Sequence, residues 1–496
     1  MMRPCRGGAQ VFRSVAKCEA LGHCIRSVSA AYDPAERPTE ERNGMSISLV
    51  ILAAGQGTRM NSDLPKVLHP LAGAPLVAHA LTAGRALDPA QVVVVAGHGA
   101  DAVRAALAEI DDSVTVVEQA EQRGTAHAVA QARAALDGVG GDVVVLYGDT
   151  PFVSADTLER MRAARAVHDV VVLGFDATDP GRYGRLMVED DGETLARIVE
   201  FKDATPAERA VTLCNSGLVC ADRAVLFDLV AAVGNDNASG EFYLTDIVAL
   251  ARGRGLRAGV VLCPEAETLG INTRTELAAA EAAFQARARA AALDDGVTLT
   301  TPDTVHFAHD TVIGRDAVVE QFVVFGPGVT VESGATVRAF SHLEGCHVSR
   351  GAVVGPYARL RPGAELAEGV RVGNFVEVKN TVMDEGAKAN HLTYLGDAHV
   401  GAGANIGAGT VTCNYDGVFK HRTEIGAGAF IGSDTMLVAP VRLGPGAVTG
   451  SGSVITEDVA EGALAIGRAK QVTKPGLGAR LMQRLRAARD AAKGKS

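Results

Sequence analysis

A six-residue period in the second half of the chain restricts its fold more than any other feature of the sequence. Aliphatic residues recur at every sixth position in two long runs, with glycine and small residues between them. They are Val354, Leu360, Leu366, Val372 and Val378, then Ile425, Ile431, Leu437, Leu443 and Ile455, with Thr449 completing the series. Neither an α-helix nor a hairpin has this period. It predicts a parallel β-helix, in which three short strands per coil each place one aliphatic residue in the core.

The repeat is interrupted between about 379 and 399 and again over 411–423. We predict inserted loops at both places, where functional residues tend to lie. The polar residues in and around them are Arg361, Lys379, Asn390, His391, Tyr394, Asn405, Asn414, Tyr415 and Ser433. A single histidine is more often structural than catalytic, so His391 alone does not define a site. A glycine-rich β-sandwich and a low-complexity segment are the alternative folds for this half.

The first half alternates apolar strands with helical stretches. Strands are predicted at 48–52, 91–96, 114–117 and 142–147, and helices at 74–85 and 100–110. This alternation predicts an α/β domain around a mostly parallel sheet. In such a sheet the ligand lies at the carboxyl ends of the strands. A helix at 275–292, rich in alanine, arginine and glutamate, is predicted to connect the two halves.

The stretch LVILAAGQGTRMNSDLPK, residues 49–66, places a glycine turn directly after the first strand. Gly55 and Gly57 allow the backbone to approach an anion closely, and Arg59 and Lys66 add positive charge. Neither common nucleotide fingerprint is present, and taken alone the turn fits any α/β protein. Further polar strings follow in order: QAEQRGT, YGDTP, GRYGR, IVEFKDA, CNSG, GEFYLTD and GINTR.

Composition excludes several classes of protein. A chain of 496 residues needs two or more cores, and its net charge of −10 argues against binding nucleic acid. No run of eighteen apolar residues exists, so no stable membrane insertion is expected. Eight cysteines occur without zinc-site spacing, which favours reduced thiols and a cytoplasmic protein.

The string AAGQGTRM, with PK shortly after it, resembles the signature of sugar-1-phosphate nucleotidylyltransferases. With the later strings in their order, the first half resembles the pyrophosphorylase domain that makes UDP-N-acetylglucosamine. The strings HLTYLGD and GAGTVTCNYDG resemble the acetyltransferase half of the same bifunctional family. The resemblance implies a Rossmann-like α/β nucleotidyltransferase domain with a mostly parallel sheet, followed by a left-handed parallel β-helix.

The resemblance also implies the domain boundaries. Residues 1–45 form an extension expected to be disordered, and we hypothesise that it is translated only from an upstream start. The expected parts after it are the pyrophosphorylase domain at 46–272, a linker helix at 273–293, the β-helix acetyltransferase domain at 294–470 and a basic helical tail at 471–496. The tail is expected either to bind an anionic surface or to pack on a neighbouring coil.

For uridylyl transfer, the resemblance implies that Arg59 and Lys66 act in catalysis and that Asp149 and Asn272 hold Mg²⁺. The residues implied to contact UTP or the UDP-sugar are Leu52, Ala53, Ala54, Gly55, Lys66, Gln119, Gly124, Thr125, Gly184, Glu200, Asn215 and Asn272. Of these, Gln119, Gly124 and Thr125 would contact uracil. The N-acetyl sugar would contact Gly184, Glu200 and Asn215.

For acetyl transfer, the resemblance makes His391 the general base, with Glu377 as its orienting partner. The sugar phosphate would be bound by Arg361, Lys379, Tyr394 and Asn405, with Lys420 as a possible helper. Acetyl-CoA would contact Asn414, Tyr415, Ser433, Ser451 and Arg468. Ser451 stands where the family pattern has alanine, a change that a backbone contact tolerates.

The implied protein is a homotrimeric bifunctional enzyme. It would acetylate glucosamine-1-phosphate with acetyl-CoA and then couple N-acetylglucosamine-1-phosphate to UTP, releasing pyrophosphate. Two alternatives remain: a nucleotidylyltransferase with a purely structural β-helix, and a catalytically silent regulatory subunit. The presence of His391 and Arg361 argues against the first, and that of Lys66, Asp149 and Asn272 argues against the second.

Overall fold

The computed structural model describes residues 46–189, 192 and 194–493. Its first strand, β1 (Ile47–Ala53), lies inside the N-terminal sheet. All seven of its residues are buried, as expected of a strand covered on both faces. It pairs in parallel with β4 (Gln91–Ala96) and β6 (Asp142–Tyr147). The predicted extension, residues 1–45, lies outside the described residues.

The sheet is mostly parallel, with the order β11-β7-β10-β6-β1-β4-β5. Strand β10 runs antiparallel to both β6 and β7. The remaining strands are β5 (Thr115–Glu118), β7 (Val170–Asp176), β8 (Arg185–Val188), β9 (Leu195–Val199), β10 (Leu213–Asp222) and β11 (Ala258–Leu262). The four predicted strands are confirmed, and β5 begins one residue later than predicted.

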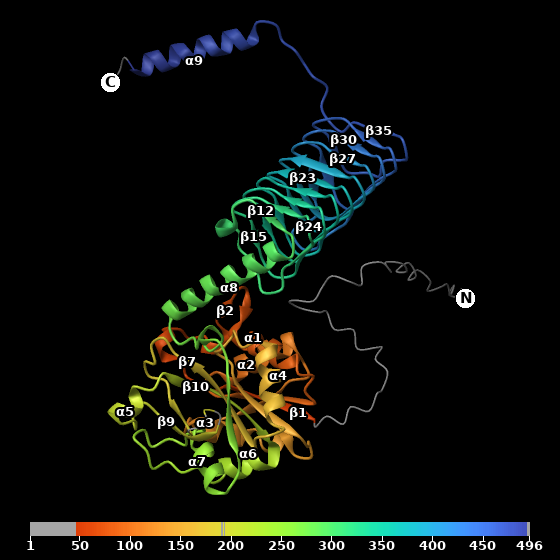
Figure 1. The fold of residues 1–496 in the computed structure, drawn as a ribbon. Coiled ribbons are helices and arrows are strands. Elements are labelled where there is room, and N and C mark those ends of the chain that lie inside the picture. The colour runs from red at the N-terminus through yellow and green to blue at the C-terminus, as the bar shows by residue number, and fades with distance from the viewer. Residues whose placement is uncertain (1–45, 190–191, 193, 494–496) are drawn as a thin grey trace, which may run out of the picture. The chain divides into compact units, whose positions relative to one another are not determined.

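Helices cover both faces of the sheet, as Figure 1 shows. One face packs against α1 (Leu76–Arg85), α2 (Ala100–Ile110) and α4 (Ala155–Ala164), and the other against α3 (Thr125–Gln131), α6 (Arg223–Val230) and α7 (Asp246–Gly253). The smaller helices are η1 (Thr58–Met60), η2 (Lys66–Leu68), η3 (Ala134–Leu136), α5 (Pro206–Arg209) and η4 (Glu265–Glu267).

The helix predicted at 74–85 is wrong for its first two residues. They form strand β3 (Ala74–Pro75), which pairs with β2 (Pro70–Leu71) in a short hairpin. The helix begins only after Pro75, because the residue before a proline is disfavoured in the helical conformation and Pro75 itself is extended, with ψ of 144°. The hairpin therefore stands directly before α1.

A long helix, α8 (Arg274–Asp294), follows the sheet. It begins with a capping box: the Thr273 hydroxyl accepts from the N–H of Glu276, and the Glu276 carboxylate accepts from the N–H of Thr273. The helix predicted at 275–292 is confirmed, with one further residue at its start and two at its end. Gly296, with φ of 84°, follows its C-terminus.

After α8 and η5 (Pro302–Thr304) the chain winds into the coils of a parallel β-helix, visible in Figure 1. The first face contains β12 (Thr298–Leu299), β14 (Val318–Val319), β17 (Thr336–Val337), β20 (Val353–Val354), β23 (Arg371–Asn374), β25 (Lys388–His391), β27 (Asn405–Ile406), β30 (Phe430–Ile431), β33 (Val448–Thr449) and β35 (Leu464–Ala465).

The second face contains β15 (Val324–Phe325), β18 (His342–Leu343), β21 (Arg359–Leu360), the starts of β24 (Glu377–Met383) and β26 (Tyr394–Val400), β28 (Val411–Cys413), β31 (Met436–Val438) and β34 (Val454–Ile455). The third face contains β13 (Val312–Ile313), β16 (Val329–Val331), β19 (Cys346–Val348), β22 (Ala364–Leu366), the ends of β24 and β26, β29 (Thr423–Ile425) and β32 (Val441–Leu443).

The residues of the six-residue series form the core of these coils. All of them are buried, from Val354 at 0% exposed to Ile455 at 5%. The one polar member, Thr449, satisfies its hydroxyl by accepting from the N–H of Gly432 and lying 3.2 Å from the Thr435 hydroxyl. The predicted β-helix is therefore confirmed.

One of the two predicted loop insertions is wrong. Residues 379–399 belong to regular coils, in which Leu366 pairs with Met383 and Met383 with Val400. These coils are seventeen residues long instead of eighteen, and the shift of phase looks like a break in the sequence. The second insertion is confirmed: Val400 pairs with Ile425, and a hairpin closed by a bridge between Tyr415 and Lys420 fills the interval.

Four exposed rings form an aromatic column at the corner between the first and second faces: Phe322, Phe340, Tyr357 and Phe375. They occupy equivalent positions of successive coils, all with positive φ. Consecutive ring centroids lie 5.0, 4.8 and 5.4 Å apart in stacked geometry. Each residue is 45% to 57% exposed, so the column presents an apolar ridge to its surroundings.

The last element is α9 (Leu477–Lys493), the helix predicted in the basic tail. Its apolar residues Leu477, Leu481, Met482 and Leu485 are 46% to 55% exposed. The packing on a neighbouring coil, expected as one of two possibilities, is thus absent within the described part of this chain. Across the described residues, no helix combines the length and the apolar character needed to cross a membrane.

Candidate active sites

Lys66 lies between two side-chain oxygens at the carboxyl edge of the sheet. Its Nζ forms an ion pair with Asp149 and donates to Oδ1 of Asn272 at 3.0 Å. The C=O of Asp149 accepts from the N–H of Ile271 at 3.0 Å, which holds the segment of Asn272 beside β6. The side chains of Lys66 and Asp149 are 12% and 18% exposed, so a ligand can still reach them. The structure brings these three predicted residues together.

The glycine turn after β1 is shaped around Lys66. Gly57 has φ of 63°, and a Cβ there would lie 2.6 Å from the Cβ of Lys66, so only glycine allows this approach. Leu52, Ala53 and Ala54 are buried at the end of β1, and the C=O of Leu52 accepts from the N–H of Gly148 at 2.9 Å. Gly55 and Arg59 are exposed in the same turn.

The predicted uracil contacts lie together after β5. Gln119 is 3% exposed, and its Nε2 donates to the C=O of Gly124 at 3.2 Å. This arrangement leaves Oε1 as an acceptor for an imide N–H. Gly124 has φ of 115°, and a Cβ there would lie 2.5 Å from the carbonyl oxygen of Phe242. Thr125 follows as the first residue of α3.

One of the predicted sugar contacts, Asn215, lines a small cavity. The N–H of Asn215 donates to the C=O of Gly184 at 2.8 Å, and Asn215 lines the cavity with Tyr147 and Thr245. Burial raises the pKa of Glu200, which is only partly offset by the hydrogen bond from the Thr245 hydroxyl at 3.1 Å. Burial also raises the pKa of Tyr147, so this hydroxyl stays protonated.

The side-chain oxygens of Asp149 and Asn272 converge on the Lys66 ammonium, so a divalent cation shared by them would take the place of that ammonium. They offer one carboxylate and one amide oxygen, and Mg²⁺ typically takes one or two such ligands beside phosphate oxygens. The described residues contain no group of three or more histidine, cysteine, aspartate or glutamate side chains arranged for a metal. A metal at Asp149 and Asn272 would therefore depend on the phosphates of a bound nucleotide.

His391 ends β25 at the corner between the first and second faces, with its side chain exposed. Its Nδ1 lies 2.7 Å from Oδ1 of Asn374, one coil earlier. Because this partner is an amide oxygen, Nδ1 carries the proton and Nε2 keeps its lone pair. The carboxylate of Glu377 accepts from Arg361 at 2.9 Å, and the partner of the His391 ring is Asn374, so the orienting role of Glu377 stays a prediction.

Residues predicted to contact acetyl-CoA continue along the same corner. Ser433 and Ser451 follow β30 and β33, and the C=O of Ser433 accepts from the N–H of Gly452 at 2.8 Å. Arg468 follows β35 and donates from its guanidinium to the C=O of Ser451. Successive coils are about 4.8 Å apart, so these residues line a strip that runs away from His391.

Positive groups gather on the second face. Arg361 follows β21, and Lys379 lies in the neighbouring strand β24. The pKa of Lys379 is lowered, chiefly by its hydrogen bond with Lys420 and then by partial burial and the positive charges of Lys420 and Arg361. Tyr394 lies on the same face, paired in register with Glu377. This cluster is suited to a phosphate group.

A carboxylate at the bend between the second and third faces, that of Asp397, binds one of the predicted acetyl-CoA contacts. Asp397 accepts from Nδ2 of Asn380 at 2.6 Å and from Nδ2 of Asn414. Burial raises the pKa of Asp397, but these hydrogen bonds and the positive charges of Lys379 and Lys420 together hold the pKa below its usual value. Asn414 is consequently buried and immobilised, whereas Tyr415 is 61% exposed in the inserted hairpin.

Asn405 lies apart from the other predicted sugar-phosphate ligands. It begins β27 on the first face, between Lys388 and Phe430 of the neighbouring coils. Arg361 and Lys379 belong to the second face. Within one chain the predicted acetyl-transfer residues therefore lie on two faces and the corner between them.

Three residues around these sites were not predicted: Asn374, Asp397 and Tyr147. Asn374 precedes His391 by one coil, so the coil length is the signal that points to it. A larger cavity, of about 670 Å³, lies away from both sites. It is lined by His399, whose ring nitrogens already face Asp384 at 2.9 Å and Glu424 at 3.2 Å.

Comparisons with known proteins agree with this two-part organisation. Residues 49–244 match the MobA-like NTP transferase domain, and residues 422–457 match the bacterial transferase hexapeptide family (six repeats). Relatives named "Bifunctional protein GlmU" match nearly end to end. The Jannaschia sp. (strain CCS1) protein is 64% identical over 90% of this chain and 98% of its own. That of Cereibacter sphaeroides is 71% identical over 90% and 98%, and that of Ruegeria sp. (strain TM1040) is 69% identical over 91% and 100%.

These matches confirm the family predicted from the motifs, and the parallel coils with hexapeptide repeats agree with the implied left-handed β-helix. The chain belongs to the GlmU family of bifunctional transferases, with an N-terminal nucleotidyltransferase domain and a C-terminal hexapeptide acyltransferase domain.

Proposed function

We propose that the chain catalyses two consecutive steps at two separate sites. The first transfers the acetyl group of acetyl-CoA to the amine of glucosamine-1-phosphate. The second couples the resulting N-acetylglucosamine-1-phosphate to UTP and releases pyrophosphate. The observation that carries the proposal is that each domain holds its own set of reactive groups: the Lys66 ammonium between Asp149 and Asn272 in one, and the oriented imidazole of His391 in the other.

In the uridylyl step, an oxygen of the sugar phosphate attacks the α-phosphorus of UTP in line with the departing pyrophosphate. Lys66 and Arg59 neutralise charge on the triphosphate, and Gln119 accepts from the imide N–H of uracil. Mg²⁺, held by Asp149 and Asn272, would supply further neutralisation when bound. The side chains therefore act by positioning and electrostatics, with no need for a protein nucleophile.

In the acetyl step, the sugar amine attacks the thioester carbonyl of acetyl-CoA. Nε2 of His391 takes the amine proton, because the hydrogen bond to Asn374 leaves its lone pair free. When the tetrahedral intermediate collapses, the C–S bond breaks and the sulfur leaves as CoA thiol with the proton that His391 took from the amine. Arg361 and Lys379 bind the sugar phosphate with the help of Tyr394, and the strip of Ser433, Ser451 and Arg468 holds the arm of CoA.

We infer that the active assembly is a homotrimer. The predicted acetyl-transfer residues lie on two faces that diverge within one chain, so Asn405 needs a second copy to complete its site. The aromatic column and the exposed apolar tip of the inserted hairpin, Val418 and Phe419, provide surface for such a contact. UTP and acetyl-CoA are made inside cells, which supports a cytoplasmic location.

The test supplies the full-length protein with glucosamine-1-phosphate, acetyl-CoA, UTP and Mg²⁺ and follows CoA thiol and pyrophosphate separately. The wild type is expected to release both. His391→Ala should lose CoA release and still form pyrophosphate from added N-acetylglucosamine-1-phosphate, whereas Asp149→Ala should do the reverse. If the wild type releases pyrophosphate but no CoA thiol, the β-helix has only a structural role. If it releases neither product, the chain is better explained as a regulatory subunit.

A further inference from the structure

Helix α8 contacts the Lys66 segment at its first turn. Arg274 donates from Nε to the C=O of Met60 at 3.2 Å, and its Nη1 lies 3.2 Å from Nδ1 of His69. The residue just before the cap of α8 is Asn272, which accepts from Lys66. The helix that leads to the β-helix therefore starts inside the proposed uridylyl site.

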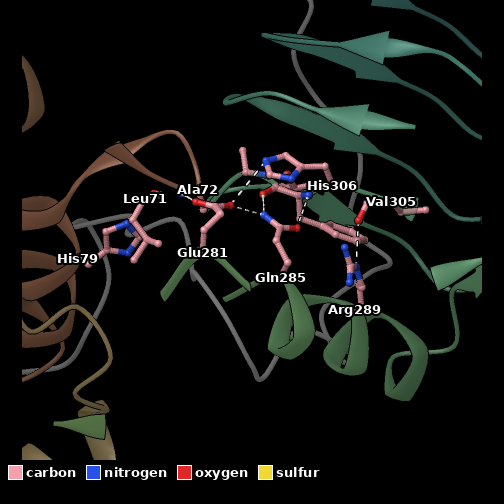
Figure 2. A network of polar contacts seen from close by, with 11 residues as sticks. Leu71, Ala72, His79, Glu281, Gln285, Arg289, Val305 and His306 are labelled. Atoms are coloured by element: carbon pink, nitrogen blue, oxygen red, sulfur yellow. Dashed lines mark hydrogen bonds and ion pairs between the residues drawn. The ribbon is translucent and has the colours of Figure 1, made fainter. Parts of the chain in front are cut away.

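The same helix holds the tip of the β2–β3 hairpin two turns further on. The tip residue, Ala72, is 2% exposed and has φ of 49°. Its N–H donates to Oε2 of Glu281 at 2.8 Å, and its C=O accepts from the N–H of His309 in the β-helix at 2.8 Å. Figure 2 shows Glu281 reaching from α8 to Ala72. Both backbone groups of the tip are thus fixed by other elements.

A buried amide ties Glu281 to the first coil. Gln285 is 4% exposed; its Nε2 donates to Oε1 of Glu281 at 2.8 Å and to the C=O of Phe307 at 2.7 Å. The N–H of Phe307 donates back to Oε1 of Gln285 at 2.8 Å. Both carboxylate oxygens of Glu281 are engaged: Oε2 by the hairpin, and Oε1 by the Gln285 amide and, at 3.6 Å, by Nε2 of His306 (Figure 2).

Only a short segment of chain connects Lys66 to the hairpin. Helix η2 begins at Lys66 and ends two residues before β2, and the N–H of Leu76 donates to the C=O of His69 at 3.1 Å across the hairpin's base. Leu71 and Leu76 pack in one buried cluster with Ala280 of α8. A movement of the hairpin tip relative to α8 is therefore transmitted to Lys66 through a short, packed segment.

We propose that Glu281 is a positioning residue for uridylyl transfer, because it fixes the hairpin that sets Lys66 between Asp149 and Asn272. The proposal rests on the role of Lys66 in the proposed function. Lys66 acts on charge that grows as pyrophosphate departs, so its displacement harms the transition state more than the bound ground state. The loss should appear in kcat and leave the KM for UTP nearly unchanged.

The test compares full-length Glu281→Ala and Glu281→Gln with wild type in steady-state uridylyl transfer. Glu281→Ala should lower kcat about tenfold with little change in KM, the effect of a small misplacement at the reacting centre. Glu281→Gln keeps an oxygen that can accept from Ala72 but turns an NH2 toward the donor Nε2 of Gln285, so its kcat should lie between those of Glu281→Ala and wild type. Glu109→Ala, which removes an exposed carboxylate from α2, is the matched control. Acetyl transfer, measured in the same samples, reports whether the β-helix remains intact.

Assaying Lys66→Ala in parallel separates the proposed role of Lys66 from the positioning role of Glu281. If it retains uridylyl activity, the proposed function of Lys66 fails. If it loses activity while Glu281→Ala keeps its kcat, the positioning role of Glu281 is refuted, and so it is if Glu281→Ala raises KM alone. Should Glu281→Ala not fold, Glu281→Asp shortens the reach to Ala72 while keeping the charge, and a wild-type kcat there would equally overturn the proposal.

Discussion

The two candidate sites are assembled in opposite ways. The uridylyl site draws Lys66, Asp149 and Asn272 from segments far apart in sequence onto one cation-binding point within a single chain. The acetyl site draws on residues one coil apart, such as Asn374 and His391, and spreads them over two faces and a corner. An open sheet collects its loops at one edge, whereas a prism of coils distributes its side chains along its length.

This difference indicates which structural changes should impair each activity. A site at a sheet edge depends on the local shape of its loops, so a single methyl group can disturb it. A site on a β-helix depends on the stacking between coils and on the neighbouring copy of the chain that would cover its exposed faces. The uridylyl activity should therefore respond to backbone changes near Lys66, and the acetyl activity to the state of assembly.

The largest effect is expected from Gly57→Ala. A Cβ at this position would lie 2.6 Å from the Cβ of Lys66, so Lys66 must move, and the uridylyl kcat should fall about a hundredfold. Acetyl transfer should be unchanged. Gly138→Ala is the control, because Gly138 also has positive φ but open space around it, which isolates backbone strain from the contact. Equal losses in both variants would show that strain alone is responsible.

A smaller effect is expected when the aromatic column is made polar. Phe340→Asp with Tyr357→Asp should weaken trimer association about thirtyfold, as for loss of an interface hot spot. Acetyl transfer should fall with the trimer population, measured by light scattering at several concentrations, while uridylyl transfer persists. Val382→Asp, on the third face and 39% exposed, is the control. A variant that stays trimeric would remove the column from the interface.

The orienting role of Asn374 can be tested with Asn374→Ala. Loss of its hydrogen bond frees the His391 ring, and the acetyl kcat should fall about tenfold, close to the worth of one hydrogen bond. Glu377→Gln should be milder, because Glu377 contacts Arg361 and not His391. Steady-state assays of CoA release distinguish the two, and a larger loss in Glu377→Gln would identify Glu377 as the orienting residue.

The smallest effect concerns pH. Lys379 has a lowered pKa, first because of its hydrogen bond with Lys420, so it loses its charge at lower pH than a free lysine. Phosphate binds the charged form, and affinity should therefore fall about fivefold in total as pH rises through that pKa. This affinity can be measured as the inhibition of acetyl transfer by N-acetylglucosamine-1-phosphate, which lacks the titrating amine of glucosamine-1-phosphate. In Lys420→Met the fall should move to higher pH; an unchanged profile would contradict this origin.

Much of the fold could be predicted because its signals are local. The six-residue period identified the β-helix core from Val354 to Ile455, and the apolar runs identified β1, β4 and β6. The error at 379–399 arose because a coil of seventeen residues shifts the phase of the pattern without leaving the fold. Sequence spacing alone does not distinguish a shorter coil from an inserted loop.

The site residues were predicted as motifs, but their partners were not. Lys66 and Asp149 stand in recognisable strings, whereas the contact of Glu281 with Ala72 joins segments 209 residues apart through a backbone N–H. Nothing in the local sequence of a helix rich in alanine marks one glutamate as special. The same holds for Asn374, whose relation to His391 depends on the length of the intervening coil.

The stacked coils have a consequence for how such a molecule can change over time. Each coil adds about 4.8 Å along the axis, and its corners repeat the same backbone shape. Duplicating or deleting one whole coil after the first coil and before the coil of Arg361 would leave the predicted residues of both centres in place. The spacing between the centres can therefore change only in steps of one coil, so the number of coils sets this distance.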